Sequence, residues 1–132
     1  MNYEKNGQTK RIQSFVDLNT WQESHKLVVL IYKTSREFPR DEQFGLTNQI
    51  RRAVVSITSN IAEGFSRHSF KEKVQFYSIA LGSLTETQNQ LIIGKDVSYL
   101  SESAYEKLTA QAIIVSKLFN GLIKKSRSIL NS

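Results

Sequence analysis

Histidine and cysteine, the side chains that most readily serve as catalytic bases and nucleophiles near neutral pH, are few in this 132-residue chain. It has two histidines and no cysteine, which removes disulfides, thiolate metal ligands and cysteine nucleophiles from consideration. His25 lies in an apolar helical stretch and His68 in a polar connection, and neither belongs to a zinc or di-iron motif. Glu63 and Glu86 are a candidate carboxylate pair, but a glutamate at helical spacing from Arg67 more often forms a structural ion pair. We therefore predict no enzyme activity, no metal and no cofactor.

Positive charge indicates a different chemistry, the binding of anions. Eighteen Lys and Arg against twelve Asp and Glu leave a net charge of +6, and no acidic residue follows Glu106. Clustered cations bind nucleic acid through its phosphates, although cations at solvated helix ends also complement the helix dipole. The sequence leaves both interpretations open. The candidate nucleic-acid-binding residues are Arg51, Arg52, Arg67, Lys71, Lys117, Lys124, Lys125 and Arg127.

Capping signals and hydrophobic spacing predict four helices that carry these residues. Capping-box spacings, in which a Ser or Thr precedes a Glu by three positions, mark three helix starts, and glycines mark two ends. The expected helices run from Thr20 to before Phe38-Pro39, from Thr47 to Gly64, from Ser69 to Gly94, and from Ser103 onward. Each would have about 20 residues and a length of roughly 30 Å.

Four amphipathic helices of matched length joined by short loops bury their apolar stripes as an antiparallel up-down-up-down bundle. The fold class is therefore all-α, and no strand pattern is apparent. We expect a mobile polar arm at residues 1–14 and one bundle domain at residues 15–130. The absence of a signal-like start or a long apolar stretch leads us to expect a cytoplasmic protein without a membrane partner.

A second stripe of small and polar residues accompanies the apolar stripe on the two middle helices. Its members recur every three or four positions, so they share a helix face. The stripe is either an ordinary solvated flank, a polar seam between the two helices, or a contact with another subunit. The predicted seam residues are Gln49, Ser56, Asn60, Glu63, Ser83 and Glu86.

The same two helices carry a family resemblance, in the stretches 46–67 and 76–86. The chain resembles the four-helix-bundle proteins encoded by intervening sequences in bacterial 23S ribosomal RNA genes. The resemblance extends from about Phe15 to Leu122, with Thr58 standing where many members have proline. The matching residues are Gln49, Arg51, Arg52, Ala53, Ser56, Ile57, Asn60, Ile61, Ala62, Glu63, Gly64, Arg67, Ala80, Gly82, Ser83, Leu84 and Glu86.

The resemblance implies a left-handed four-helix bundle that assembles into a homopentamer. It also implies similarity to the accessory variability determinant of diversity-generating retroelements, a pentameric barrel thought to bind nucleic acid and a reverse transcriptase. Our first functional hypothesis is therefore an oligomeric RNA- or DNA-binding bundle. The alternative is a scaffold whose basic face binds an acidic protein such as a reverse transcriptase.

Overall fold

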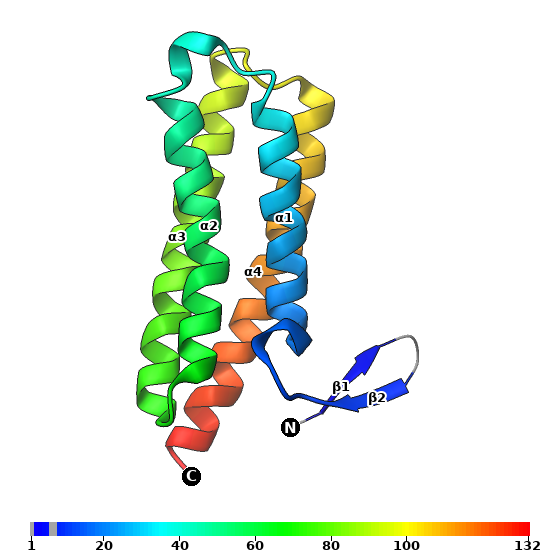
Figure 1. Cartoon of the computed structure of the whole chain (residues 1–132), viewed down its shortest axis with the longest axis vertical. Coiled ribbons are helices and arrows are strands. Elements are labelled where there is room, and N and C mark those ends of the chain that lie inside the picture. Colours follow the sequence, from blue (N-terminus) through cyan, green and yellow to red (C-terminus); the bar gives the residue numbers. More distant parts are fainter. Residues whose placement is uncertain (1, 6–7) are drawn as a thin grey trace.

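The apolar residues that recur every three or four positions lie on the inner faces of four helices, shown in Figure 1. The computed structural model describes residues 2–5 and 8–132. Successive helices run in opposite directions, and each packs against two neighbours in the order α1–α2–α3–α4–α1. The antiparallel four-helix bundle predicted from the sequence is confirmed. The helices are α1 (Asn19–Ser35), α2 (Leu46–Ser66), α3 (Phe70–Asp96) and α4 (Glu102–Leu130).

The core forms where the sequence places its apolar stripes. The side chains of Ile50, Val54, Ile57 and Ile61 on α2 are all at most 1% exposed. Phe119 of α4 is fully buried among them in the same cluster. Each such side chain contributes about 1.5–3 kcal/mol of transfer free energy when it leaves water, so the four stripes together hold the bundle closed.

The helix starts agree only in part with the capping signals. Ser69 caps α3 as predicted, because its hydroxyl accepts a hydrogen bond from the backbone N–H of Glu72. Helix α4 begins two residues earlier than predicted, with Ser101 accepting from the N–H of Ala104. Thr20 is not a cap but a buried residue inside α1.

The true capping box near α1 belongs to a preceding 3₁₀ turn, η1 (Phe15–Asp17). Ser14 and Asp17 bond to each other's backbone there, so the chain turns into α1 before Thr20 is reached.

The predicted helix stops at Gly64 and Gly94 are wrong, because both glycines are buried inside their helices. At the end of α3 the backbone turns at Ser98, which has a φ of 67°. The N–H of Tyr99 then bonds to the carbonyl of Gly94 at 2.8 Å. This is the Schellman arrangement with serine in the left-handed position. The helices also differ in length, from 17 residues in α1 to 29 in α4.

Residues outside the bundle form short elements that the sequence did not predict. Strands β1 (Asn2–Lys5) and β2 (Gln8–Arg11) pair antiparallel near the start of the chain. A second 3₁₀ turn, η2 (Arg40–Glu42), connects α1 to α2. The mobility of residues 1–14 stays a prediction, and residues 1, 6 and 7 of that arm lie outside the described residues.

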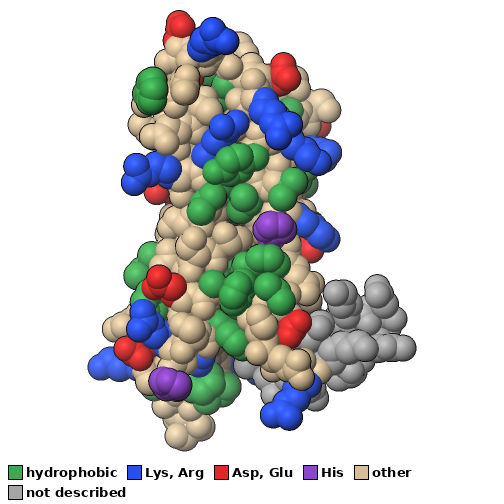
Figure 2. All heavy atoms as spheres, in the orientation of Figure 1, with side chains coloured by type: hydrophobic (Ala, Val, Ile, Leu, Met, Phe, Trp, Pro, Cys, Tyr) green, Lys and Arg blue, Asp and Glu red, His purple; other side chains and the backbone are tan. Residues whose placement is uncertain are grey.

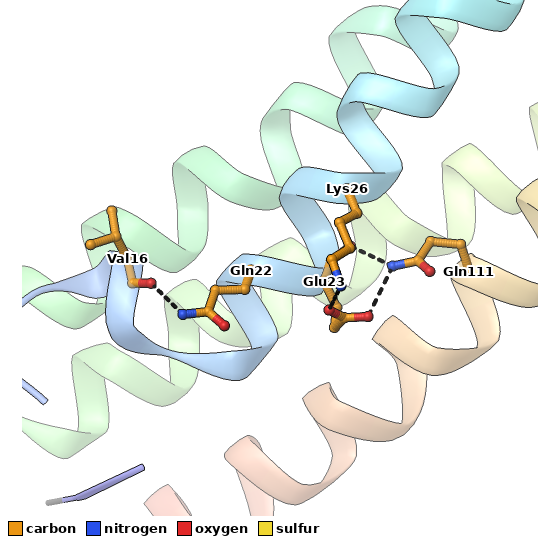
Figure 3. A network of polar contacts seen from close by, with 5 residues as sticks. All are labelled: Val16, Gln22, Glu23, Lys26 and Gln111. Atoms are coloured by element: carbon orange, nitrogen blue, oxygen red, sulfur yellow. Dashed lines mark hydrogen bonds and ion pairs between the residues drawn. The ribbon is translucent and has the colours of Figure 1, made fainter. Parts of the chain in front are cut away.

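A polar network fastens the N-terminal part of α1 to its surroundings, as Figure 3 shows. The Gln22 amide donates to the carbonyl of Val16 at 2.9 Å and so holds η1 against α1. The Gln111 amide of α4 donates to the backbone carbonyl of Glu23 at 2.8 Å, while the Glu23 carboxylate pairs with Lys26 at 2.7 Å. The contact between α1 and α4 is therefore fixed by a side chain bonded to backbone.

Candidate nucleic-acid interface

The C-terminal half of α4 presents four cations to solvent. Lys117, Lys124, Lys125 and Arg127 are all exposed, and no ion pair within residues 11–132 involves any of them. The helix carries no carboxylate beyond Glu106. Their charge is therefore not neutralised by the described part of the chain, and it is available to an anion.

A groove separates this part of α4 from α3. Six residues line it: Ser78 and Leu81 from α3, and Asn120, Ile123, Lys124 and Arg127 from α4. Its volume is about 290 Å³. Leu81 and Ile123 form the apolar floor, whereas the exposed side chains bring two cations, a hydroxyl and an amide to the walls. Two of the predicted binding residues thus come together beside neutral hydrogen-bonding groups.

Arg51 is held by α1 and does not face outward as a free cation. Its Nε donates to the Ser35 hydroxyl at 2.8 Å, and its guanidinium lies 4.8 Å from the centre of the Tyr32 ring. Ser35 is buried. This arginine therefore links α2 to α1, and its charge is partly used inside the bundle.

Arg52 lies on the adjacent, exposed side of α2. It lines a second hollow, of about 370 Å³, between α2 and α3. Gln49, Ser56 and Glu86 also line that hollow, so a carboxylate is present on its wall. The local charge is mixed, which makes this hollow a weaker anion site than the α3–α4 groove.

The remaining two predicted cations lie where α2 passes into α3. Arg67 forms an ion pair with Glu63 at 3.6 Å and covers the Phe76 ring at 4.7 Å. Both members of the pair are well exposed, so it contributes little stability. Lys71 is exposed in the first turn of α3. The structure does not bring these two residues together with the cations of α4 into one pocket.

The residues of the predicted polar seam lie between or beside α2 and α3. The hydroxyls of Ser56 and Ser83 are 2.9 Å apart across the two helices. Asn60 bonds within α2, donating to the carbonyl of Ser56 at 2.8 Å, and Glu86 accepts from Gln90 within α3 at 3.3 Å. Gln49 and Glu63 are exposed. Among these seam residues, the hydrogen bond between Ser56 and Ser83 therefore spans the two helices, whereas those of Asn60 and Glu86 stay within one helix.

Comparison with known proteins identifies the group to which this fold and these residues belong. The model of the 23S rRNA-intervening sequence protein family matches residues 16–121. The chain belongs to this family. A crystal structure of a protein of unknown function from the S23 ribosomal protein family of Bacteroides thetaiotaomicron VPI-5482 is similar, with 26% identity and a TM-score of 0.72. That alignment covers 80% of this chain and 98% of the other. No curated protein matches the chain.

A second basic residue of this intervening-sequence protein, besides Arg51, is used for structure. The Lys73 ammonium donates to the carbonyl of Phe65 at 2.6 Å, at the C-terminal end of α2. It also lies 5.3 Å from the centre of the Phe65 ring and 5.8 Å from that of Phe70, and burial lowers the pKa of its ammonium group. A cation at a helix C-terminus is stabilised by the unpaired carbonyls, so Lys73 caps α2.

No neighbouring helix of this chain approaches Gly82 closely. A Cβ at Gly82 would meet nothing within 4 Å, and the same holds for Gly121 on α4. Both are exposed positions inside long helices. The reason for a glycine at either position is therefore not packing within this chain.

The sequence did not predict the groove, and only its α4 wall has a recognisable pattern in the sequence. Asn120 shares a helix face with Lys117, Lys124 and Arg127 by its spacing of three and four, which points to a polar face on α4. Nothing in the sequence pairs that face with Ser78, which lies 42 positions earlier.

Within residues 11–132, no group of three or more His, Asp or Glu side chains could hold a metal ion. In the same residues, no helix combines the length and apolarity needed to cross a bilayer.

Proposed function

We propose that this protein is a non-enzymatic, self-associating bundle that binds nucleic acid, RNA above all, through phosphate groups at the C-terminal half of α4. The observation that carries this proposal is the set of exposed cations on a surface of α4 without carboxylates, Lys117, Lys124, Lys125 and Arg127. Such a surface attracts any polyphosphate and reads little sequence. The net charge of +6 acts in the same direction.

Self-association is supported by apolar side chains on the outside of the bundle. Ile79 and Ile93 share the outer face of α3 and are 54% and 42% exposed, and Val97, which directly follows the helix, is 50% exposed. Figure 2 shows further hydrophobic side chains gathered on one face of the molecule. Surfaces of this kind mark contacts with other proteins. The family resemblance favours a pentamer, in which five copies would present a net charge of about +30 and bind multivalently.

The decisive experiment is a salt titration of RNA binding. A fluorescent single-stranded RNA of about 20 nucleotides is titrated with protein at several salt concentrations, and the dissociation constant is measured by anisotropy. Log K should fall linearly with log salt with a slope of about −0.7 for each phosphate contact. A single-stranded DNA of the same sequence measures the RNA preference.

Two results would overturn parts of the proposal. Undetectable binding at about 50 mM salt, where phosphate contacts are strongest, would remove the nucleic-acid function. Tighter binding to a polyglutamate of equal charge than to RNA would replace it with the acidic-protein scaffold. Light scattering tests assembly separately, because a pentamer of the 15.1 kDa chain has a mass of about 75 kDa and a monomer at all concentrations would contradict self-association.

A further inference from the structure

We infer that the groove between α3 and α4 is the place where the protein holds phosphate groups of a nucleic-acid strand, with Lys124 and Arg127 as the charged contacts and Ser78 and Asn120 as hydrogen-bond donors. This inference rests on the proposed function and assigns it to one site. It distinguishes two of the four α4 cations, which line the groove, from two that do not.

Charge on the groove walls is of one sign. Lys124 and Arg127 are three residues apart on α4, so they share one face and lie about one turn from each other. The α3 wall carries no acidic residue between Glu72 and Glu86, and the α4 wall carries none after Glu106. An anion in the groove therefore meets two cations and no opposing carboxylate, in contrast to the hollow beside Arg52 and Glu86.

Hydrogen-bonding groups complete the walls. Ser78 of α3 and Asn120 of α4 both line the groove, and neither side chain has a hydrogen bond within residues 11–132. Hydroxyl and amide groups donate to phosphate oxygens, and an arginine guanidinium can make two parallel bonds to one phosphate. Four groups able to contact a phosphodiester thus surround one hollow.

The size of the groove fits a small part of a polymer. Its volume of about 290 Å³ is just below the range for pockets that enclose a whole ligand, about 300–1,000 Å³. A sugar–phosphate segment fills such a space, and the rest of the strand continues along the surface.

A glycine directly follows a groove residue on each of the two helices. Gly82 directly follows Leu81, and Gly121 directly follows Asn120. A helical glycine costs up to about 1 kcal/mol relative to alanine, and no atom of the chain lies within 4 Å of a Cβ built at either position. The missing side chains leave room for a strand to approach the helix backbones next to the groove.

The test compares two double variants that remove the same charge. K124Q/R127Q removes the groove cations, and K107Q/K125Q removes two exposed α4 cations that share a different face of the helix and do not line the groove. All four side chains are exposed and unpaired in the described residues, so both variants should keep the wild-type melting temperature. RNA anisotropy is measured for each across the same salt series.

The groove variant should bind RNA at least tenfold more weakly than the wild type, and its salt slope should be smaller by about 1.4, the value for two lost phosphate contacts. The control should weaken binding less than about threefold through the general field. Ser78→Ala and Asn120→Ala should each weaken binding severalfold with an unchanged slope. Equal losses in the two double variants would overturn the groove assignment while leaving the proposed function intact. No binding by the wild type would overturn the proposed function itself.

A second measurement uses the absence of cysteine. RNA should slow alkylation of the thiol in a Ser78→Cys variant and leave a Ser103→Cys variant unaffected, because Ser103 is exposed in the first turn of α4, far from the groove. Inorganic phosphate at millimolar concentration should protect the groove thiol poorly. Protection by phosphate equal to that by RNA would show a site for free phosphate and overturn the assignment to a strand, and no protection by either would overturn the groove.

Discussion

The two sides of α3 differ in how closely the neighbouring helix approaches. Toward α2, the backbone at Gly64 comes so near that an added Cβ would lie 2.8 Å from the Tyr77 ring, and Ser56 and Ser83 bond to each other at 2.9 Å. Toward the end of α4, a hollow of about 290 Å³ separates the helices. Polar groups in the close contact satisfy one another, whereas those in the groove have no partner in the described chain. The side of α3 that faces α2 therefore stabilises the fold, whereas the side that faces the end of α4 has polar groups available to a ligand.

Filling the close contact should produce the largest effect. Gly64→Leu inserts a side chain where the first carbon already meets Tyr77 and Phe76 at less than 3.0 Å. Overpacking of this kind costs about 1–3 kcal/mol and occasionally more, so we expect a loss of about 3 kcal/mol in the free energy of unfolding. Urea denaturation monitored by circular dichroism measures it.

Gly121→Leu is the matched control for that substitution. Nothing lies within 4 Å of a Cβ at Gly121, so its stability should stay within about 1 kcal/mol of the wild type. Similar losses of stability in the two variants would mean that Gly64 is no more tightly packed than Gly121.

High pH should produce the second-largest loss of stability, again on the side of α3 that faces α2. Burial raises the pKa of Tyr77 to about 12, whereas the phenol of the unfolded chain ionises near pH 10. Between these values the unfolded state binds fewer protons than the folded state, so stability is complete below pH 10 and falls as the pH rises toward 12. The expected loss is about 2 kcal/mol at pH 12.

The measurement for Tyr77 is urea denaturation at pH 9 and pH 11.5 in the wild type and in Tyr77→Phe. Lysines titrate over the same range in both proteins, so the difference between them isolates the phenol. The variant should lose less stability than the wild type on going to the higher pH. An equal loss would indicate that the Tyr77 phenol ionises normally in the folded protein.

The sequence predicts local features of the fold well and contacts between helices poorly. The buried stripe at Ile50, Val54, Ile57 and Ile61 and the cap at Ser69 follow from spacing within a single helix. The sequence placed Gly64 at the end of a helix, but Gly64 is inside α2 and packs against the Tyr77 ring. A single sequence does not distinguish a glycine that ends a helix from one that makes room for a side chain of another helix.

The roles of the candidate binding residues also depend on contacts between helices that the sequence does not predict. Arg51 has the sequence context of a surface cation, yet Ser35 and Tyr32 of another helix hold it. The groove depends on Ser78 and Asn120 coming together from two helices. Both outcomes are set by how helices pack, which hydrophobic spacing determines only in outline.

The smallest expected effect is a gain, and it tests the open side of the comparison. Gly121→Ala adds a methyl group at an exposed helical position with no atom within 4 Å, so helix propensity alone should raise the free energy of unfolding by about 0.5–1 kcal/mol. Thermal denaturation measures the gain, and Gly82→Ala should behave in the same way. A bound strand that needs the space next to the helix backbone would explain why the chain has a destabilising glycine after a groove residue on each helix. Both variants should therefore bind RNA more weakly than the wild type and melt at a higher temperature. Higher stability with unchanged RNA binding would separate the glycines from the groove's function, and lower stability would show that these helix positions are not open.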